Sequence, residues 1–452
     1  MMKIVVVGDG KVGHMLVQQL SQENHDVVVI DNNANALKKA TDQYDVMGVL
    51  GNGATYSVQL EAGVDKADML IAATSLDERN ILCCIVAKKL GVKYTVARVR
   101  NPEYSEQMRY IENELSLAMH INPELAAAEE ISRVLRYPAA TKISPFARDR
   151  VEMAEFILTG DSPLNGMALY EFKNRYQLKI LVCAVQRGND VIIPAGDFVL
   201  QAHDRITIVS SAKDINTFFE KVIRAKYKVK NVMIVGGSRI AYYLTRQLLD
   251  MGIRVKIIDK EESRCRELCE LLPNVRTIHG DARSKELLQE EGIENTDAFV
   301  TLTGFDEENI ILSMYAMACK VPKVISKVND FNLPDIMDKI GLDIIISPKM
   351  IVSDQIVGYV RAMQNSEGNP METLYKLLDG KLEALGFQVR GDYPFLGVPL
   401  KDLKLRPQTL VACVVRHGRT IIADGGTTIE KNDHVVIVTL SEKIKDIRDI
   451  MV

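Results

Sequence analysis

The sequence lacks the features that mark several classes of protein. Its seven cysteines form no C-x-x-C pair, which favours small core residues in a reducing compartment over a zinc site or a disulfide framework. The net charge of −4 gives no overall basic field for nucleic acid. No apolar run approaches the roughly 18 residues that span a bilayer, and the first strand begins too early to follow a signal peptide. These absences predict a cytosolic protein that reaches a membrane only through a partner.

Recognisable catalytic motifs are missing as well. None of the seven histidines belongs to a nucleophile–base–orienter pattern, and H-E-x-x-H, G-x-S-x-G and G-x-x-x-x-G-K-[ST] do not occur. A dehydrogenase needs a catalytic domain beside its nicotinamide, and the repeat described below leaves no length for one. We therefore expect no enzyme; an NAD-dependent oxidoreductase is the alternative function, and a scaffold without ligand is a third.

The chain opens with a strand-like run, Lys3–Val7, that leads into G-x-G-x-x-G. Gly8 permits a tight turn, Gly10 lets the backbone approach a pyrophosphate at the N-terminus of the following helix, and Gly13 permits close helix–strand packing. Asp31 ends the next apolar run, where its carboxylate would accept hydrogen bonds from an adenosine ribose. NAD(H) is the predicted ligand, with ATP and ADP as alternatives that carry the same ribose hydroxyl. NADP is disfavoured because no Arg follows the acid.

The pattern around this motif predicts the fold of the first third of the chain. Five apolar runs alternate with amphipathic segments up to about Val99, and 116–121 could add a sixth strand. This alternation is typical of a parallel sheet with helices on both faces, a Rossmann-like α/β lobe. The pair Asn122–Pro123 predicts a helix start, with the helix running to about Arg136. After Pro145, shorter strand-like runs broken by Gly, Asn and Asp predict a small α+β module.

The same order of features begins again at Lys230. Gly236 takes the place of Gly8 and Asp259 that of Asp31, both at a spacing of 228 residues (236 minus 8, and 259 minus 31). The sequence is therefore a tandem duplication of a nucleotide-binding lobe plus a module. We predict four segments: lobe 1 (1–137), module 1 (138–225), lobe 2 (230–362) and module 2 (371–452).

Two segments are predicted to be linkers. Residues 221–230 carry five basic residues and no acid, a charge run that favours a solvated linker, with contact to a nucleotide phosphate or an acidic partner as the alternative. Residues 365–370 would separate lobe 2 from module 2.

Candidate binding residues follow from the rule that ligands of open α/β sheets lie at the carboxyl ends of strands. For those at strand ends, turn chemistry or a helix cap is the alternative role. The candidates in lobe 1 are Gly8, Asp9, Gly10, Lys11, Val12, Gly13, Asp31, Asn52, Gly53, Thr74, Ser75 and Arg98. Those in lobe 2 are Gly236, Gly237, Ser238, Arg239, Ile240 and Asp259. Because Ser238 and Ala241 replace the second and third glycines, lobe 2 binds a different nucleotide, binds weakly, or is structural.

A group of acids in lobe 2 is a weaker candidate for a ligand site. Asp281, Asp306, Glu307 and Glu308 could hold a divalent cation at the end of the second sheet. Acids are also expected in the first turn of a helix, where they interact favourably with the helix dipole. We favour that role and predict no metal site.

Taken together, these features resemble the TrkA family, the regulatory subunits of bacterial Trk and Ktr-type potassium uptake systems. The resemblance covers essentially the whole chain and rests on the glycine motif, Asp31, Gly51–Thr55, Thr74–Ser75 with Asp77 and Asn80, and Arg98, followed by the same order from Val232. It implies two tandem RCK (KTN) domains, each a Rossmann-like lobe with a TrkA-C module.

The resemblance also implies a function and its partners. It implies a peripheral subunit on the cytoplasmic face of the membrane, docked on a separate potassium-translocating protein and responsive to NAD(H) and adenine nucleotides. A ring of RCK lobes is implied, for which we expect a tetramer of tandem chains, and the helices that begin at Pro123 and Pro348 would mediate lobe pairing.

Overall fold

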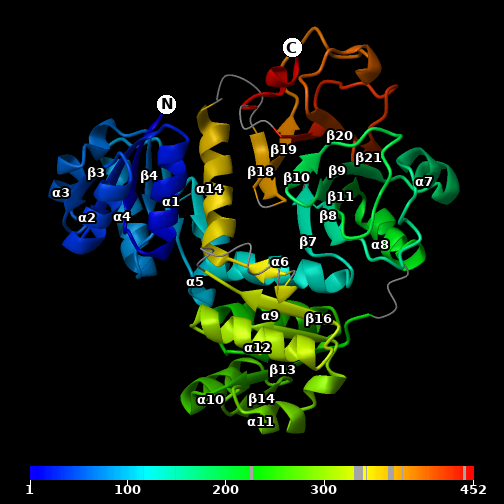
Figure 1. Ribbon diagram of the computed structural model, residues 1–452. Coiled ribbons are helices and arrows are strands. Elements are labelled where there is room, and N and C mark those ends of the chain that lie inside the picture. Colours follow the sequence, from blue (N-terminus) through cyan, green and yellow to red (C-terminus); the bar gives the residue numbers. More distant parts are fainter. Residues whose placement is uncertain are drawn as a thin grey trace. The chain divides into compact units, whose positions relative to one another are not determined.

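The strands of the computed structural model form four sheets within the residues that it describes (Figure 1). These are residues 1–452 without 113, 116, 148, 224–227, 330–339, 343, 365–370, 379 and 441–443. Two sheets have six parallel strands and two have five antiparallel strands. The predicted class, two Rossmann-like lobes each followed by a small α+β module, is confirmed. The predicted linker 365–370, part of the linker 221–230, and residue 116 of the sixth predicted strand lie outside the described residues.

Lobe 1 is built on a sheet with the strand order β3-β2-β1-β4-β5-β6. Its strands read as continuous apolar runs because helices cover both faces of a parallel sheet, and Ile4 to Val7 of β1 are all buried. Its elements are β1 (Lys3–Val7), α1 (Lys11–Gln22), β2 (Asp26–Asp31), α2 (Ala34–Gln43), β3 (Met47–Leu50), α3 (Tyr56–Glu61), β4 (Met69–Ala72), α4 (Asp77–Lys89), β5 (Tyr94–Arg98), α5 (Pro102–Ile111) and β6 (Met119–Ile121).

Lobe 2 repeats this topology, with the strand order β14-β13-β12-β15-β16-β17. The repeat in the sequence is therefore a repeat in the structure. Its elements are β12 (Asn231–Val235), α9 (Arg239–Asp250), β13 (Arg254–Asp259), α10 (Glu262–Leu271), β14 (Arg276–His279), α11 (Lys285–Glu290), β15 (Ala298–Thr301), α12 (Asp306–Ala318), β16 (Lys323–Lys327) and β17 (Ile345–Ile346).

A long helix follows each lobe: α6 (Pro123–Arg136) and α14 (Pro348–Gln364). The predicted start and end of α6 are confirmed. The side chain of Asn122 accepts a hydrogen bond from the backbone N–H of Leu125 at 3.0 Å, which satisfies one of the donors that a helix start leaves without a partner.

The two modules are antiparallel sheets, with strand orders β10-β9-β11-β8-β7 and β18-β19-β22-β20-β21. The strand β7 includes Pro145 and precedes the first strand that the sequence predicted for the module. Pro145 is tolerated because β7 is an edge strand, which has no further neighbour to receive a hydrogen bond from this position. The elements of module 1 are β7 (Lys142–Phe146), β8 (Val151–Ile157), α7 (Leu169–Tyr176), β9 (Leu181–Arg187), β10 (Asp190–Ile192), β11 (Arg205–Ser210) and α8 (Ala212–Lys221). Those of module 2 are β18 (Met371–Leu377), β19 (Leu382–Gln388), β20 (Thr409–Arg416), β21 (Arg419–Ile422) and β22 (His434–Thr439).

The sheets of the two modules share a hydrophobic core. The ring of Phe146 meets that of Tyr375 edge to face, with 5.0 Å between the ring centres. Beside this contact, the Lys142 ammonium donates to the carbonyl of Lys376 at 2.9 Å. Buried residues of both modules join this core, among them Val151, Met153, Cys183, Leu382, Ala384, Cys413 and Val436. The two copies of the module are thus packed against each other within one chain.

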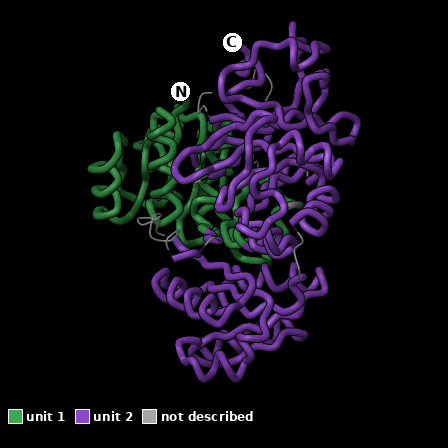
Figure 2. Tube along the Cα trace, turned by 45° about the vertical axis from the view of Figure 1, so that its right-hand side comes forward, with its two compact units in different colours: residues 1–127, 347–360 green, residues 128–346, 361–452 purple. Residues whose placement is uncertain are grey.

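The chain divides into two compact units that do not follow the order of the four segments (Figure 2). Unit 1 holds residues 1–127 together with 347–360, so most of α14 belongs with lobe 1. Within this unit, Ser353 of α14 donates to the side chain of Gln19 at 2.7 Å. Tyr359 packs edge to face on Tyr94, with the ring centres 6.4 Å apart. The helix that follows lobe 2 in the sequence therefore packs against lobe 1.

Two further features of the chain follow from its composition. The seven cysteines are free thiols, five of them buried, which suits their predicted role as small core residues. Among the helices described, none is both long enough and apolar enough to cross a bilayer.

We predict that Phe146→Ala lowers the free energy of unfolding by about 3 to 5 kcal/mol, the usual cost of a cavity left by a buried Phe. Phe146 is 1% exposed and lies in the core that the two modules share. Urea denaturation followed by circular dichroism measures the change. Tyr170→Ala, at a side chain 55% exposed on α7, is the control and should have little effect. A variant at position 146 as stable as this control would contradict the shared core.

Candidate functional site

The turn between β1 and α1 requires glycine at two positions. Gly8 has a φ of +97°, in the left-handed region that glycine adopts without strain. A Cβ added to Gly13 would lie 1.8 Å from the carbonyl oxygen of Gly8, so only glycine lets α1 approach the turn this closely. Around Gly10, by contrast, no described atom lies within 4 Å of an added Cβ, and the residue is exposed. The backbone at Gly10 is therefore open to a ligand.

Asp31 is held at the carboxyl end of β2 by two backbone amides. Its Oδ2 accepts from the N–H of Asp9 at 2.6 Å, and its Oδ1 accepts from the N–H of Asn33 at 2.8 Å. One amide comes from the glycine turn and the other from the start of α2. The carboxylate thus has a fixed orientation, and each oxygen keeps a second lone pair for a hydroxyl donor.

The N-terminus of α1 offers donors to an anion. Its N-cap residue is Gly10, and among the described residues no side chain caps this helix start. The first backbone N–H groups of a helix have no partner within the helix, and the helix dipole adds partial positive charge there. Lys11 is exposed in this first turn and Val12 is buried. The geometry is that of an anion site at a helix N-terminus.

Asp9 lies in the turn with its carboxylate against the ring of His14, 3.3 Å from Nδ1. The His14 ring in turn lies 5.4 Å from that of Tyr44, centre to centre. Burial raises the pKa of Asp9, and His14 opposes this shift. The side chain of Asp9 is therefore occupied within the protein, and its backbone N–H is the group that it contributes to the clamp on Asp31.

The residues after β3 approach the glycine turn closely. A Cβ added to Gly53 would lie 2.2 Å from Cγ1 of Val7, so this position also requires glycine. The side chain of Asn52 accepts from the N–H of Ala54 at 3.1 Å. Asn52 thus has the turn role that the sequence left as its alternative.

Thr74, Ser75 and Arg98 are brought together at the ends of β4 and β5. The buried Asn80 ties these strand ends: its side chain accepts from the N–H of Thr74 at 2.8 Å and donates to the carbonyl of Arg98 at 2.9 Å. The guanidinium of Arg98 donates to the carbonyl of Thr74 at 2.5 Å, and that of Arg100 donates to the carbonyl of Ser75 at 2.6 Å. These groups brace the carboxyl edge of the sheet, where the predicted ligand crevice lies. Arg100 was not among the predicted site residues, because nothing in its local sequence distinguishes it.

Lobe 2 keeps the acid and its clamp. Gly236 has a φ of +95°, and Asp259 accepts from the N–H of Gly237 at 2.5 Å and from that of Glu261 at 2.8 Å. The start of α9 differs from that of α1, because the Ser238 hydroxyl accepts from the N–H of Ala241 at 3.4 Å and so caps the helix. Of the other predicted residues, Arg239 is exposed and Ile240 is buried.

Three of the four acids considered for a cation, Asp281, Asp306 and Glu308, have partners within the protein. Asp281 pairs with the guanidinium of Arg283, which lowers the pKa of this carboxyl to about 2. Asp306 accepts from the side chain and backbone of Asn329, at 3.0 and 2.9 Å. In the part of the chain that the structure describes, no three His, Cys, Asp or Glu side chains are grouped as metal ligands would be.

The fold and the two glycine turns define a protein with tandem Rossmann-type lobes, each followed by an antiparallel module. The model of the TrkA-N domain matches residues 4–116 and 232–348, and that of the TrkA-C domain matches 153–222 and 386–452. The chain belongs to the TrkA family of potassium uptake systems, whose members are regulatory subunits and not enzymes.

Relatives match this chain over almost its whole length. The Trk system potassium uptake protein TrkA of Vibrio alginolyticus is 31% identical, covering 98% of this chain and 96% of its own length. A TrkA homologue of Methanosarcina mazei is also 31% identical, over 99% of both chains. Among solved structures, the GsuK channel bound to NAD is similar in fold, with a TM-score of 0.65 at 18% identity over 98% of this chain and 77% of that one.

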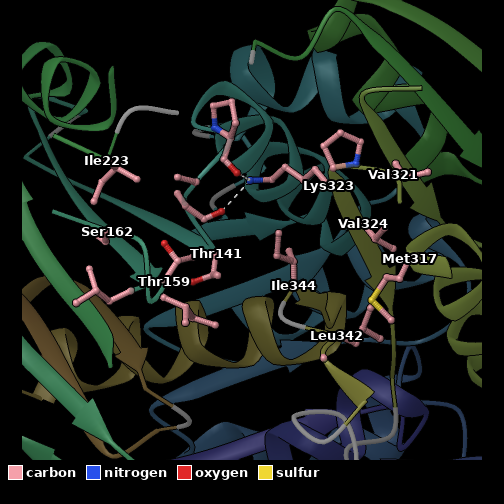
Figure 3. A pocket seen from close by; sticks show the side chains of 17 residues that line it. Thr141, Thr159, Ser162, Ile223, Met317, Val321, Lys323, Val324, Leu342 and Ile344 are labelled. Atoms are coloured by element: carbon pink, nitrogen blue, oxygen red, sulfur yellow. Dashed lines mark hydrogen bonds between the residues drawn. The ribbon is translucent and has the colours of Figure 1, made fainter. Parts of the chain in front are cut away.

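A cavity of about 370 Å³ lies within unit 2 (Figure 3). At its edge the ammonium of Lys323 donates to the carbonyls of Tyr137, Pro138 and Ala140, at 3.1, 2.8 and 2.8 Å. These carbonyls follow the end of α6, where a cation also interacts favourably with the helix dipole. Burial lowers the pKa of Lys323 to about 7. The residue of lobe 1 that corresponds to Lys323, at a spacing of 229 (323 minus 94), is Tyr94. The repeat therefore did not predict a buried lysine here.

The lowered pKa gives a prediction for stability. Between pH 7 and about 10, the unfolded chain binds a proton on Lys323 that the folded chain has lost, so the free energy of unfolding should rise with pH in this window. Lys323→Met removes this contribution. The urea midpoint of wild type should therefore rise relative to that of Lys323→Met from pH 7 to pH 10.

The matched control is Lys213→Met, at an exposed lysine of α8. It should shift the midpoint by the same small amount at every pH. If the two substitutions showed the same dependence on pH, Lys323 would not be the buried group that the geometry indicates.

Proposed function

We propose that the chain is a nucleotide-sensing regulatory subunit that gates a separate potassium-translocating membrane protein. The observation that carries this proposal is the crevice of lobe 1. There the carboxylate of Asp31 is clamped by two amides beside a helix start that no described side chain caps. In a Rossmann-type lobe, an acid at the end of the second strand suits the ribose of a dinucleotide, and the neighbouring helix N-terminus suits its pyrophosphate.

NAD(H) is the proposed ligand, with ATP and ADP as the other candidates. The residues present fit such a group, because Gly10 leaves the approach to the turn open and Gly13 places α1 against it. Neighbours in fold support the choice: one GsuK structure is bound to NAD, and another, with a TM-score of 0.50, is bound to ADP. The ligand acts here as an effector, so the protein needs no group that reacts with it.

The family supports a partner and a location for this chain. The full-length relatives are named Trk system potassium uptake proteins, which supports a Trk-type potassium-translocating subunit as the partner of this chain. With no membrane-spanning helix among those described, docking on the cytoplasmic face of that subunit would bring the chain to the membrane. The proposed assembly is a ring of RCK lobes formed by four tandem chains.

The energetics explain why such a regulator would be assembled as a ring. Allosteric coupling at one site typically amounts to about 1 to 3 kcal/mol, whereas moving a gate from 1:99 to 99:1 needs roughly 5.5 kcal/mol. Several nucleotide sites must therefore act together on one gate. Occupancy of a single site that switched transport fully would contradict this mechanism.

The binding site is tested by Asp31→Ala. A hydrogen bond to a charged group contributes about 1.5 to 3 kcal/mol, so the affinity for NAD should fall about 10-fold to 100-fold. Isothermal titration calorimetry measures the change. Asp65→Ala, at an exposed acid of the same lobe, should leave the affinity unchanged. An Asp31→Ala variant with wild-type affinity would exclude this carboxylate from the ribose.

A thermal-shift panel identifies the ligand. NAD, NADH, ATP, ADP and a cyclic dinucleotide are compared on wild type and Asp31→Ala. We expect NAD or NADH to raise the melting temperature of wild type more than that of Asp31→Ala, because a ligand stabilises the state that binds it. No shift with any of the five would overturn the proposed site and favour a scaffold without ligand.

A further inference from the structure

The two crevices differ at three positions that the repeat makes equivalent. At the spacing of 228, Gly237 takes the place of Asp9. Arg264 and Leu268, both on α10, take the places of two alanines of α2, Ala36 and Ala40. Lobe 1 thus has a side chain in the turn and small residues on the helix, and lobe 2 has the reverse.

In lobe 2 the large side chains of α10 pack onto the glycine turn. Nε of Arg264 donates to the carbonyl of Gly237, and its Nη1 pairs with Glu267 at 2.6 Å. A Cβ added to Gly237 would lie 2.7 Å from Cδ1 of Leu268 and 3.3 Å from Cγ of Arg264, so lobe 2 has no room for a side chain at the turn position that Asp9 occupies in lobe 1. Gly237 is buried, as is its counterpart Asp9.

These contacts lie on the path that a dinucleotide would take. Its adenosine ribose lies on the acid and its pyrophosphate at the helix N-terminus, so the ligand crosses the turn between the two. In lobe 2, Asp259 and Arg264 both lie against Gly237 of the turn, because a Cβ added there would also lie 3.1 Å from Oδ2 of Asp259. At the far end, the Ser238 hydroxyl already accepts from an N–H of the first turn of α9.

We propose that Arg264, packed with Leu268 on the turn, closes the crevice of lobe 2 to dinucleotides, so that each chain binds one dinucleotide, in lobe 1. This inference rests on the proposed function of lobe 1. A ligand that displaced Arg264 would break a hydrogen bond from a charged donor to a buried carbonyl, which lowers affinity about 10-fold to 100-fold. The clamped acid of lobe 2 is retained as a structural link between β13, the turn and α10.

The number of NAD molecules bound per chain tests the inference, measured by equilibrium dialysis and calorimetry on the full-length protein. We expect one equivalent for wild type, a loss of affinity of 10-fold to 100-fold for Asp31→Ala, and one equivalent of unchanged affinity for Asp259→Ala. Two equivalents for wild type, one of them lost in Asp259→Ala, would overturn the inference and leave the proposed function intact. No binding by wild type would instead overturn the proposed function.

Opening the crevice tests the role of Arg264 itself. Arg264→Ala should add a second, weaker equivalent of NAD, and combining it with Asp259→Ala should remove that equivalent. Arg266→Ala is the matched control, because Arg266 lies on the same helix, is exposed and pairs only locally with Glu262. It should keep one equivalent. If Arg264→Ala, with a circular dichroism spectrum like that of wild type, also kept one equivalent, Arg264 would not be the residue that closes lobe 2.

Discussion

The clamp on the acid at the end of the second strand is the interaction on which the site depends. Asp31 orients its carboxylate through two backbone amides, and one of these comes from a turn that exists only because Gly8 and Gly13 let α1 approach it. The backbone therefore fixes both ends of the proposed ligand site, the acid and the helix start. Such a site is preorganised, so little conformational entropy is lost when a ligand binds.

The same clamp recurs in lobe 2, where its surroundings have changed. Asp259 is held as Asp31 is, but the turn above it is covered by α10. Duplication thus preserves the backbone geometry that builds the lobe and leaves the side chains around it free to diverge. If each chain keeps one sensing site, a ring of four chains has four, and couplings of about 1 to 3 kcal/mol each sum to about 4 to 12 kcal/mol, a range that includes the roughly 5.5 kcal/mol that a two-state gate requires.

The first residues of two equivalent strands, β5 and β16, both contact the other half of the chain. The first residue of β5, Tyr94, packs on α14 in unit 1, and the first residue of β16, Lys323, holds the carbonyls that follow α6 in unit 2. Equivalent strands of the two lobes thus contact segments from the other half of the chain: β5 contacts α14, and β16 contacts the residues that follow α6.

Local patterns in the sequence were enough to predict the lobes, the glycine turns, both acids and the start of α6. Each of these depends on neighbouring residues and is repeated at a constant spacing. The strand around Pro145 was missed because an edge position is a property of the sheet and not of the local sequence. The contacts of Arg264 and Lys323 could not be predicted either: both join segments distant in the chain, and an arginine or lysine on its own indicates only an exposed face.

Potassium flux through the reconstituted membrane partner is the most direct test of the central claim. Proteoliposomes that contain this partner would be loaded with wild-type chain or with Asp31→Ala, and the flux recorded as NAD is titrated. The account predicts that NAD changes the flux with wild type at concentrations that fill lobe 1, and that about 10-fold to 100-fold more NAD is needed with Asp31→Ala. A flux that NAD leaves unchanged, or that responds equally in both proteins, would contradict it.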